Sequence, residues 1–167
     1  NPIQERQYMM FFVVAFYTGM RPGEVLALHW TDIDLPARLI RIRRTYSDRF
    51  GEGPVKTESS VRDIGIPVPL FEELQAHLRF QRGMPGFSPD FLVCGGPAHL
   101  GFTALRERNF SYSASAGLPN IRLHAYRHSH ASLLINNGIN IQEVARRLGH
   151  SNVQITWNTY AHLYPRE

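Results

Sequence analysis

The sequence has 167 residues, a formal net charge of +4 and a pI near 9.6, with 43% hydrophobic and 19% charged residues. These values exclude a disordered chain and suit one soluble domain, and the basic charge weakly favours a polyanionic partner such as nucleic acid. The longest apolar run, residues 8–17, is about half of the ~20 residues that a membrane span requires, and the single Cys94 excludes an internal disulfide and suits a reducing cytoplasm.

The first part of the chain predicts two helices. Residues 4–18 are apolar on nearly all sides, which predicts a buried helix that ends at Gly19. Pro22 is typical of the first turn of a second helix, so Arg21 is expected at a tight junction between the two. Position alone favours an ordinary surface role for Arg21.

The middle of the chain predicts a small sheet. Residues 30–34 are expected to form a loop, and residues 39–46 alternate apolar and basic side chains as a half-buried strand does. Residues 51–54 predict a turn, and Val55 with Lys56 is expected to begin or end a second strand. Residues 61–66 complete the antiparallel sheet.

The second half of the chain is predicted to be helical. Residues 68–81, 103–116 and 123–136 predict helices, and residues 82–100, rich in Gly and Pro, predict a long surface connection. Residues 141–148 predict a short amphipathic helix closed by Gly149, and residues 151–154 fit a capping box that begins a last helix. The expected fold class is mainly α with a small antiparallel three-stranded β-sheet (α+β).

Polar groups able to handle a phosphate are concentrated between His124 and Tyr160. His124 and Arg127 are three residues apart at a helix start, so both can project from one face. Taken singly, each has a simpler interpretation, as a core histidine and a salt-bridged arginine. His124 and His128 also have the i, i+4 spacing of zinc ligands, but Ala125 stands where a metalloprotease has its glutamate base.

A helix-turn-helix DNA reader is a second alternative for this region. Residues 135–148 contain two predicted helices around Asn136-Asn137-Gly138. That motif accounts for the basic charge but leaves the histidines and Tyr160 without a role.

Five short motifs occur in a specific order along nearly the whole chain. They are Thr18-Gly19-Met20-Arg21-Pro22-Gly23-Glu24, Lys56-Thr57, His124-Ala125-Tyr126-Arg127-His128, Leu148-Gly149-His150 and Asn158-Thr159-Tyr160-Ala161-His162. Together they resemble the catalytic domain of tyrosine recombinases of the phage and mobile-element integrase type. The resemblance implies a single catalytic domain over residues 1–167, with the amino-terminal core-binding and arm-binding DNA domains absent from the fragment.

The resemblance also implies cleavage and rejoining of DNA through a covalent 3′-phosphotyrosine, with no metal, no ATP and no other cofactor. The implied catalytic residues are Arg21, Lys56, His124, Arg127, His150 and the nucleophile Tyr160, and the supporting residues are Glu24 and His128. Two arginine forks and a histidine donor suit the charge that builds on the phosphate oxygens. His124 matches a histidine associated with proton handling near the nucleophile, and Lys56 matches the acid that protonates the leaving 5′ oxygen.

The implied partner is double-stranded DNA. The full-length protein is expected to act as a homotetramer in a synaptic complex, whereas the fragment is expected to be a monomer. No membrane association is expected. The expected location is the bacterial cytoplasm, in association with the nucleoid. Two alternatives stay open: a type IB topoisomerase-like strand transferase, which shares the chemistry, and a catalytically idle DNA-binding module.

Overall fold

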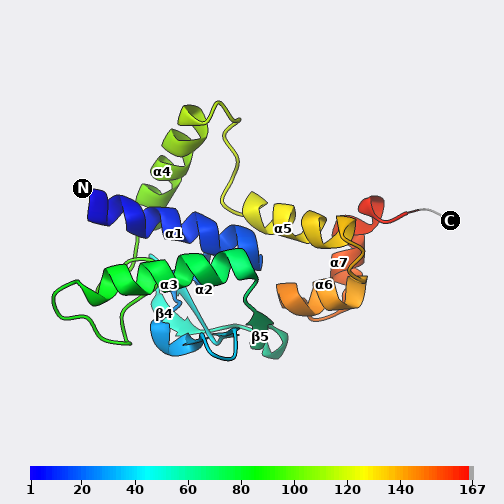
Figure 1. The fold of residues 1–167 in the computed structure, drawn as a ribbon. Coiled ribbons are helices and arrows are strands. Elements are labelled where there is room, and N and C mark those ends of the chain that lie inside the picture. Colours follow the sequence, from blue (N-terminus) through cyan, green and yellow to red (C-terminus); the bar gives the residue numbers. More distant parts are fainter. Residues whose placement is uncertain (166–167) are drawn as a thin grey trace.

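The computed structural model describes residues 1–165, which form seven α-helices, three 3-10 helices and five short strands (Figure 1). The helices are α1 (Pro2–Thr18), α2 (Pro22–Leu26), α3 (Val68–Arg82), α4 (Phe102–Ser115), α5 (Ala125–Asn136), α6 (Ile141–Leu148) and α7 (Val153–Tyr160). The strands are β1 (Ile33–Asp34), β2 (Leu39–Ile42), β3 (Arg44–Ser47), β4 (Gly51–Pro54) and β5 (Arg62–Gly65). The 3-10 helices are η1 (Trp30–Asp32), η2 (Glu58–Ser60) and η3 (Ala161–Leu163). The predicted fold class is confirmed.

The ends of α1 and α2 follow the local sequence signals. The Asn1 side chain accepts a hydrogen bond from the Ile3 amide at 3.0 Å and begins α1. Gly19 ends α1 with φ of 66°, as predicted, and Pro22 opens α2 at its first position. Arg21 therefore lies at the junction between the two helices.

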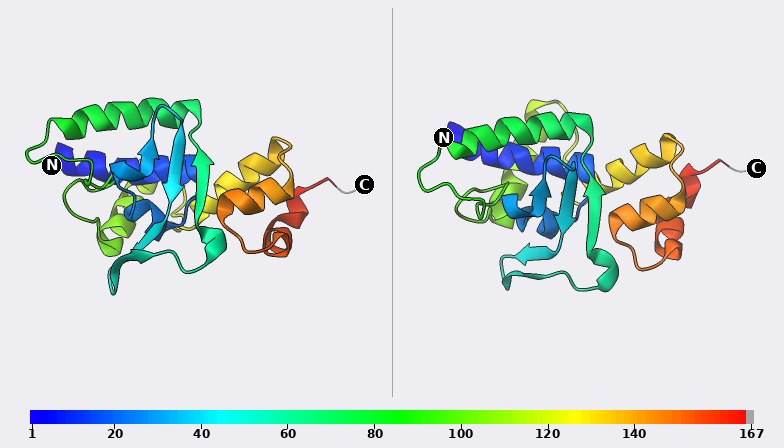
Figure 2. Two further views of the ribbon diagram at one scale, coloured as in Figure 1. Left: turned by 90° about the horizontal axis from the view of Figure 1, so that it is seen from below. Right: turned by 60° about the horizontal axis from the view of Figure 1, so that its bottom comes forward.

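The main sheet is antiparallel with the strand order β1-β2-β5. It lies below α1 and α3 in Figure 1 and in front of them in the view from below (Figure 2). Ile40, Ile42 and Ile64 point into the core, where Leu70 and Leu74 of α3 meet them. The prediction of a loop at residues 30–34 was wrong, because η1 and β1 form there; two paired residues are too few to give a periodic signal.

A second sheet, the pair β3-β4, forms a hairpin whose strand bounds differ from the prediction. Residues 39–46 were expected to be one strand, but the strand breaks at Arg43, whose guanidinium donates to the carbonyl oxygens of Ile42 and Arg62 at 3.0 and 2.9 Å. Residues 51–54 were expected to be a turn and instead form β4. Lys56 consequently follows the hairpin rather than lying within a strand.

The segment between α3 and α4 is only partly a surface connection. Phe91, Leu92, Val93 and Cys94 are buried, which corrects the prediction for residues 82–100. Their backbone is held by a buried glutamine of α3, because the Gln81 amide donates to the carbonyl oxygens of Leu92 and Val93 at 3.1 Å each. Such side-chain contacts leave no periodic pattern in the sequence.

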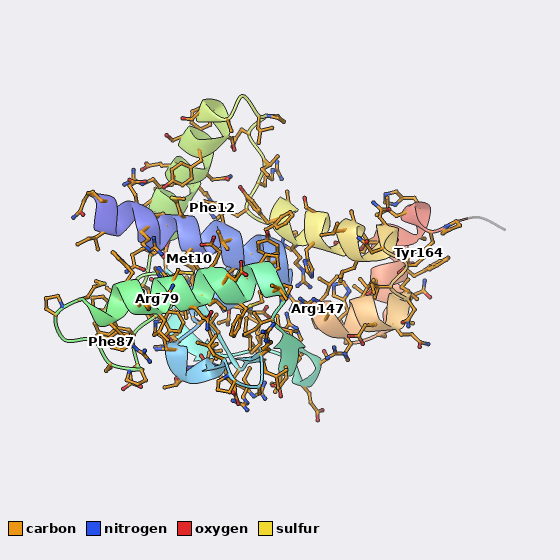
Figure 3. The ribbon with its side chains drawn as sticks, viewed as in Figure 1. Met10, Phe12, Arg79, Phe87, Arg147 and Tyr164 are labelled. Carbon is orange, nitrogen blue, oxygen red and sulfur yellow. The ribbon has the colours of Figure 1, made fainter. Side chains whose placement is uncertain are left out.

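Helices α5, α6 and α7 form a second, smaller core around Ala131, Ile135, Val144, Leu148 and Tyr160. They lie beyond the end of α1 in Figure 1. Arg147 lies at the junction in Figure 3, and its guanidinium donates to Tyr17 O at 3.1 Å and to His130 Nε2 at 2.9 Å. These contacts join the small core to α1.

The start of α7 differs in one residue from the predicted capping box. The Asn152 side chain, not that of Ser151, accepts from the Ile155 amide at 3.2 Å. The predicted helix itself is present. No helix in the part of the chain that the structure describes has the length and apolar character of a membrane span.

Candidate active site

Arg21 and Glu24 form the first part of the candidate site. The Arg21 amide donates to Glu24 Oε2 at 2.9 Å, and its guanidinium donates to Oε1 at 3.2 Å. Glu24 is only 3% exposed, whereas the Arg21 side chain is 37% exposed. The carboxylate thus holds one edge of the Arg21 guanidinium and leaves the rest open to a ligand.

Arg62 is a buried partner of this pair that the sequence analysis missed. Its guanidinium donates to both oxygens of Glu24, at 3.0 and 2.9 Å, and to Arg147 O at 2.8 Å. Burial opposes ionisation of Glu24, but the hydrogen bonds and charge of Arg62 together with Arg21 lower the pKa of Glu24. A signal was available in the sequence. Arg62 and Ile64 are two residues apart and therefore share the buried face of β5, where a charged arginine needs an acidic partner.

Gly149 brings α6 close to Arg62. Its φ of 75° is in the left-handed region, and a Cβ added there would lie 2.7 Å from Arg62 Nη1. The glycine of the Leu148-Gly149-His150 motif is therefore required both by the helix end and by the close approach of the guanidinium.

Arg127 is the second arginine of the candidate site and is 3% exposed. It donates to Gly19 O at 2.8 Å and to Leu148 O at 2.6 Å, so that it joins the end of α1 to the end of α6. Burial and the nearby charge of Arg21 lower the pKa of Arg127 to about 9, which still leaves the guanidinium charged at neutral pH.

His150 lies between Arg127 and α7. Arg127 Nη2 is 3.2 Å from His150 Nε2, and His150 Nδ1 is 2.6 Å from Thr156 Oγ1. Because a guanidinium only donates, Nε2 is the acceptor here and Nδ1 carries the proton toward Thr156. Burial and the charges of Arg127 and Arg21 lower the pKa of His150 to about 4, so the ring is neutral at pH 7.

Tyr160 is buried, with 4% of its surface exposed, and its hydroxyl lies 2.5 Å from Nδ1 of His128. Burial raises the pKa of Tyr160, while the charge of Arg127 opposes that rise. The family resemblance implied proton handling by His124, yet His128 is the histidine in contact with the hydroxyl. The His124 ring stacks edge-on against His128 with 4.9 Å between centroids.

One surface pocket gathers several of the predicted residues. Arg21, Glu24, Lys56 and His150 line it, together with Tyr46 and other residues of the hairpin and of the α2 region. Lys56 is exposed and reaches the pocket from the segment after β4. Tyr160 and Arg127 are buried and do not line it, whereas His124 is exposed and lines a neighbouring pocket together with Pro22 and Phe102.

Comparisons with known proteins identify the family of the chain. The model of the phage integrase family matches residues 99–167. The chain is 32% identical to a tyrosine recombinase XerC-like protein of Caldanaerobacter subterraneus subsp. tengcongensis over 93% of this chain and 46% of that protein. It is also 32% identical to the ICEBs1 integrase of Bacillus subtilis, over 99% of this chain and 48% of the integrase.

A solved structure shares the fold over the whole chain. The Tn1549 transposon integrase, in complex with transposon right end DNA, superposes with a TM-score of 0.69 at 24% identity, over 100% of this chain and 61% of that one. The chain spans about half the length of the curated relatives it matches. On these matches the chain belongs to the phage integrase family, the tyrosine recombinases, and has the fold of their catalytic domains.

Proposed function

We propose that this chain is the catalytic domain of a site-specific DNA recombinase, which cleaves and rejoins DNA strands through a 3′-phosphotyrosine during integration or excision of a mobile element. The observation that carries the proposal is the position of α5. This helix holds Arg127 against His150 and, one residue later, His128 against the Tyr160 hydroxyl. An anion-binding group and a nucleophile with a base are thereby placed side by side.

In this mechanism Arg21 and Arg127 bind the non-bridging oxygens of the scissile phosphate. Negative charge builds on those oxygens during attack, and two guanidinium forks stabilise it. His150 donates a further hydrogen bond after it gains a proton, which the charge of the phosphate favours. Glu24 and Arg62 keep Arg21 in place through their buried hydrogen bonds.

Tyr160 requires a base, because a phenol whose pKa is raised by burial is a poor nucleophile at neutral pH. His128 Nδ1 is at hydrogen-bond distance and accepts the proton in our proposal, with His124 supporting its ring. Lys56 gives a proton to the leaving 5′ oxygen. The phosphotyrosine conserves the energy of the broken bond, so rejoining needs no ATP, and the arginines provide the charge that a metal provides in other strand transferases.

Double-stranded DNA is the proposed partner, in agreement with the DNA in the structure of the Tn1549 integrase. The pI near 9.6 suits a contact with phosphates that weakens as salt rises. We further propose that the full-length protein works as a homotetramer, in the bacterial cytoplasm at the nucleoid.

A nicked suicide substrate tests the proposal directly. The wild-type chain should form a covalent protein–DNA adduct that survives denaturing electrophoresis, and Tyr160→Phe should form none while still binding DNA. Tyr164→Phe is the matched control, because the Tyr164 hydroxyl contacts Ile139 O at 3.3 Å, away from His128, and this variant should form the adduct. An adduct in Tyr160→Phe would refute the assignment.

A further inference from the structure

A cluster of side chains outside the candidate active site has the donors of a metal centre. His29, Glu52 and His99 each offer one ligand atom, and these atoms lie within 4.8 Å of one another. We propose that they bind one divalent transition-metal ion of the zinc class, which fastens the β3-β4 hairpin to the body of the domain. His29 follows α2, Glu52 lies in β4 and His99 precedes α4, so the ion would join three distant parts of the chain.

The His29 ring is oriented so that Nε2 faces the other two side chains of the cluster. Its Nδ1 lies 2.5 Å from Asp90 O, and because a carbonyl oxygen only accepts, Nδ1 carries a proton. Nε2 of the neutral ring is then a lone pair, yet it faces both carboxylate oxygens of Glu52 at 3.0 and 2.9 Å. A neutral Nε2 and a carboxylate oxygen are both acceptors, so this contact is satisfied either by a second proton on the ring or by a metal ion between the two groups. An imidazole fixed through its other nitrogen by a carbonyl oxygen is also the usual arrangement of a metal-ligating histidine.

The other two ligands are equally well oriented. His99 Nε2 lies 2.7 Å from Glu52 Oε2, and the His99 ring stacks on Tyr46 with 4.2 Å between centroids and 4° between planes. Arg44 donates to Glu52 Oε1 at 3.0 Å and to Asp32 Oδ2 at 2.6 Å. Arg44 thus holds one carboxylate oxygen and leaves Oε2 directed toward both imidazoles.

The donor set and its exposure fit zinc better than calcium or magnesium. Two imidazole nitrogens and one carboxylate oxygen suit zinc and related ions, whereas calcium and magnesium require oxygen ligands. The side chains of His29, Glu52 and His99 are 16%, 21% and 27% exposed, so an ion can enter and a water molecule can complete four ligands.

The ion would have a structural role in the neighbourhood of Lys56. Glu52 is four residues before Lys56, and Tyr46, which stacks on His99, lines the same pocket as Lys56. Binding would therefore order the hairpin that precedes Lys56, without contact between the ion and DNA. The inference about metal binding does not depend on the proposed recombinase activity.

Titration of the metal-free protein with Zn²⁺ tests the inference. Isothermal titration calorimetry should give one ion per chain, and bound zinc should raise the melting temperature. His29→Ala and His99→Ala should each weaken binding by more than the roughly 100-fold that loss of an orienting partner alone can cost. Glu52→Gln, which preserves size and the acceptor for Arg44, should weaken binding as well. Co²⁺ in the wild-type protein should give the visible absorption of a four-coordinate site.

His162→Ala is the matched control, because His162 is exposed and lies outside the cluster. The zinc affinity of this variant should equal that of the wild type. Should His29→Ala alter the fold of the metal-free protein, His99→Ala, at the most exposed ligand, decides the question. The inference is overturned if zinc does not bind, or if binding survives both histidine substitutions. Loss of binding in His128→Ala alone would place zinc at the His124–His128 pair instead. Failure of any of these tests leaves the adduct assay of Tyr160 untouched.

Discussion

His128 and His124 are next to each other in space, but only His128 contacts the hydroxyl of Tyr160, the proposed nucleophile. Its Nδ1 lies 2.5 Å from the Tyr160 hydroxyl and can accept the hydroxyl proton, whereas no ring hydrogen bond of His124 is present within residues 1–165. A base must lie within hydrogen-bond reach of the proton that it removes. The geometry therefore favours His128 over His124 for this role.

This difference leads to a first prediction at the residue scale. His128→Asn should slow cleavage of a nicked substrate by about 10²–10⁴-fold, the usual contribution of a general base, and His124→Asn should have a smaller effect. Single-turnover adduct formation measures both rates. Thermal melting of each variant serves as a control for folding, because His128 contacts Tyr160, which is part of the small core. The reverse order of the two effects would return the role to His124.

Lys56 gives a second prediction at this scale. Lys56→Ala should cleave ordinary DNA slowly, because an alkoxide leaves poorly without a proton. Replacement of the 5′ bridging oxygen by sulfur should restore the rate of this variant nearly to that of the wild type, since a thiolate leaves without protonation. Rates of adduct formation on the two substrates provide the measurement. Without such a rescue, Lys56 loses its role as the acid.

At the scale of elements, Arg62 connects β5 with α2 and α6. The Glu24–Arg62 pair is buried, with side chains 2% and 4% exposed, and the Arg62 guanidinium also holds the last turn of α6 through Arg147 O. Loss of one partner leaves a buried charge unpaired, which is much more costly than loss of a surface ion pair.

We therefore predict that Arg62→Met lowers the free energy of unfolding by about 3–5 kcal/mol. Arg41→Met is the control: it breaks an exposed pair with Asp34, of which the side chains are 44% and 31% exposed, and should cost about 0–1 kcal/mol. Urea denaturation gives both values. Equal decreases in the free energy of unfolding of the two variants would show that the buried pair contributes no more to stability than an exposed pair.

The same elements explain how far the sequence could predict the structure. The long helices, and the short α6 with its regular apolar spacing and Gly149 cap, were predicted because their signals are local. The break between β2 and β3 and the burial of residues 91–94 were not, since they involve contacts of Arg43 with Arg62 O and of Gln81 with Leu92 O, which leave no local signal. The residues of the candidate site came from ordered motifs, whereas the Arg62 network and the His128 contact required three-dimensional positions.

At the scale of the whole molecule, buried neutral histidines make stability depend on pH. Burial is the main cause that lowers the pKa of His77 and His130 from 6.5 to about 4. His77 is 0% exposed and its Nε2 lies 2.7 Å from Val93 O. In the unfolded chain both rings gain protons near pH 6.5, so the unfolded state binds more protons than the folded state between about pH 6.5 and pH 4.

The free energy of unfolding should therefore be greatest above about pH 6.5 and fall as the pH is lowered toward 4. Each of the two histidines can contribute a slope of up to about 1.4 kcal/mol per pH unit. Urea denaturation at several pH values between 4 and 7 measures the slope, and His77→Phe should reduce it. A flat profile over this range would mean that these histidines become protonated without unfolding.

The burial of Tyr160 has a consequence for the timing of any strand transfer. Its ring is part of the small core of α5–α7, and it does not line the pocket that contains Arg21 and Lys56. Its hydroxyl nevertheless contacts His128, which is exposed, so the ring is held in the core while the hydroxyl lies at the edge of it. If Tyr160 is the nucleophile, a movement of α7 that brings this hydroxyl to a phosphate in the pocket draws on the stability of three short helices, and amide hydrogen exchange in α7 measures how easily they open.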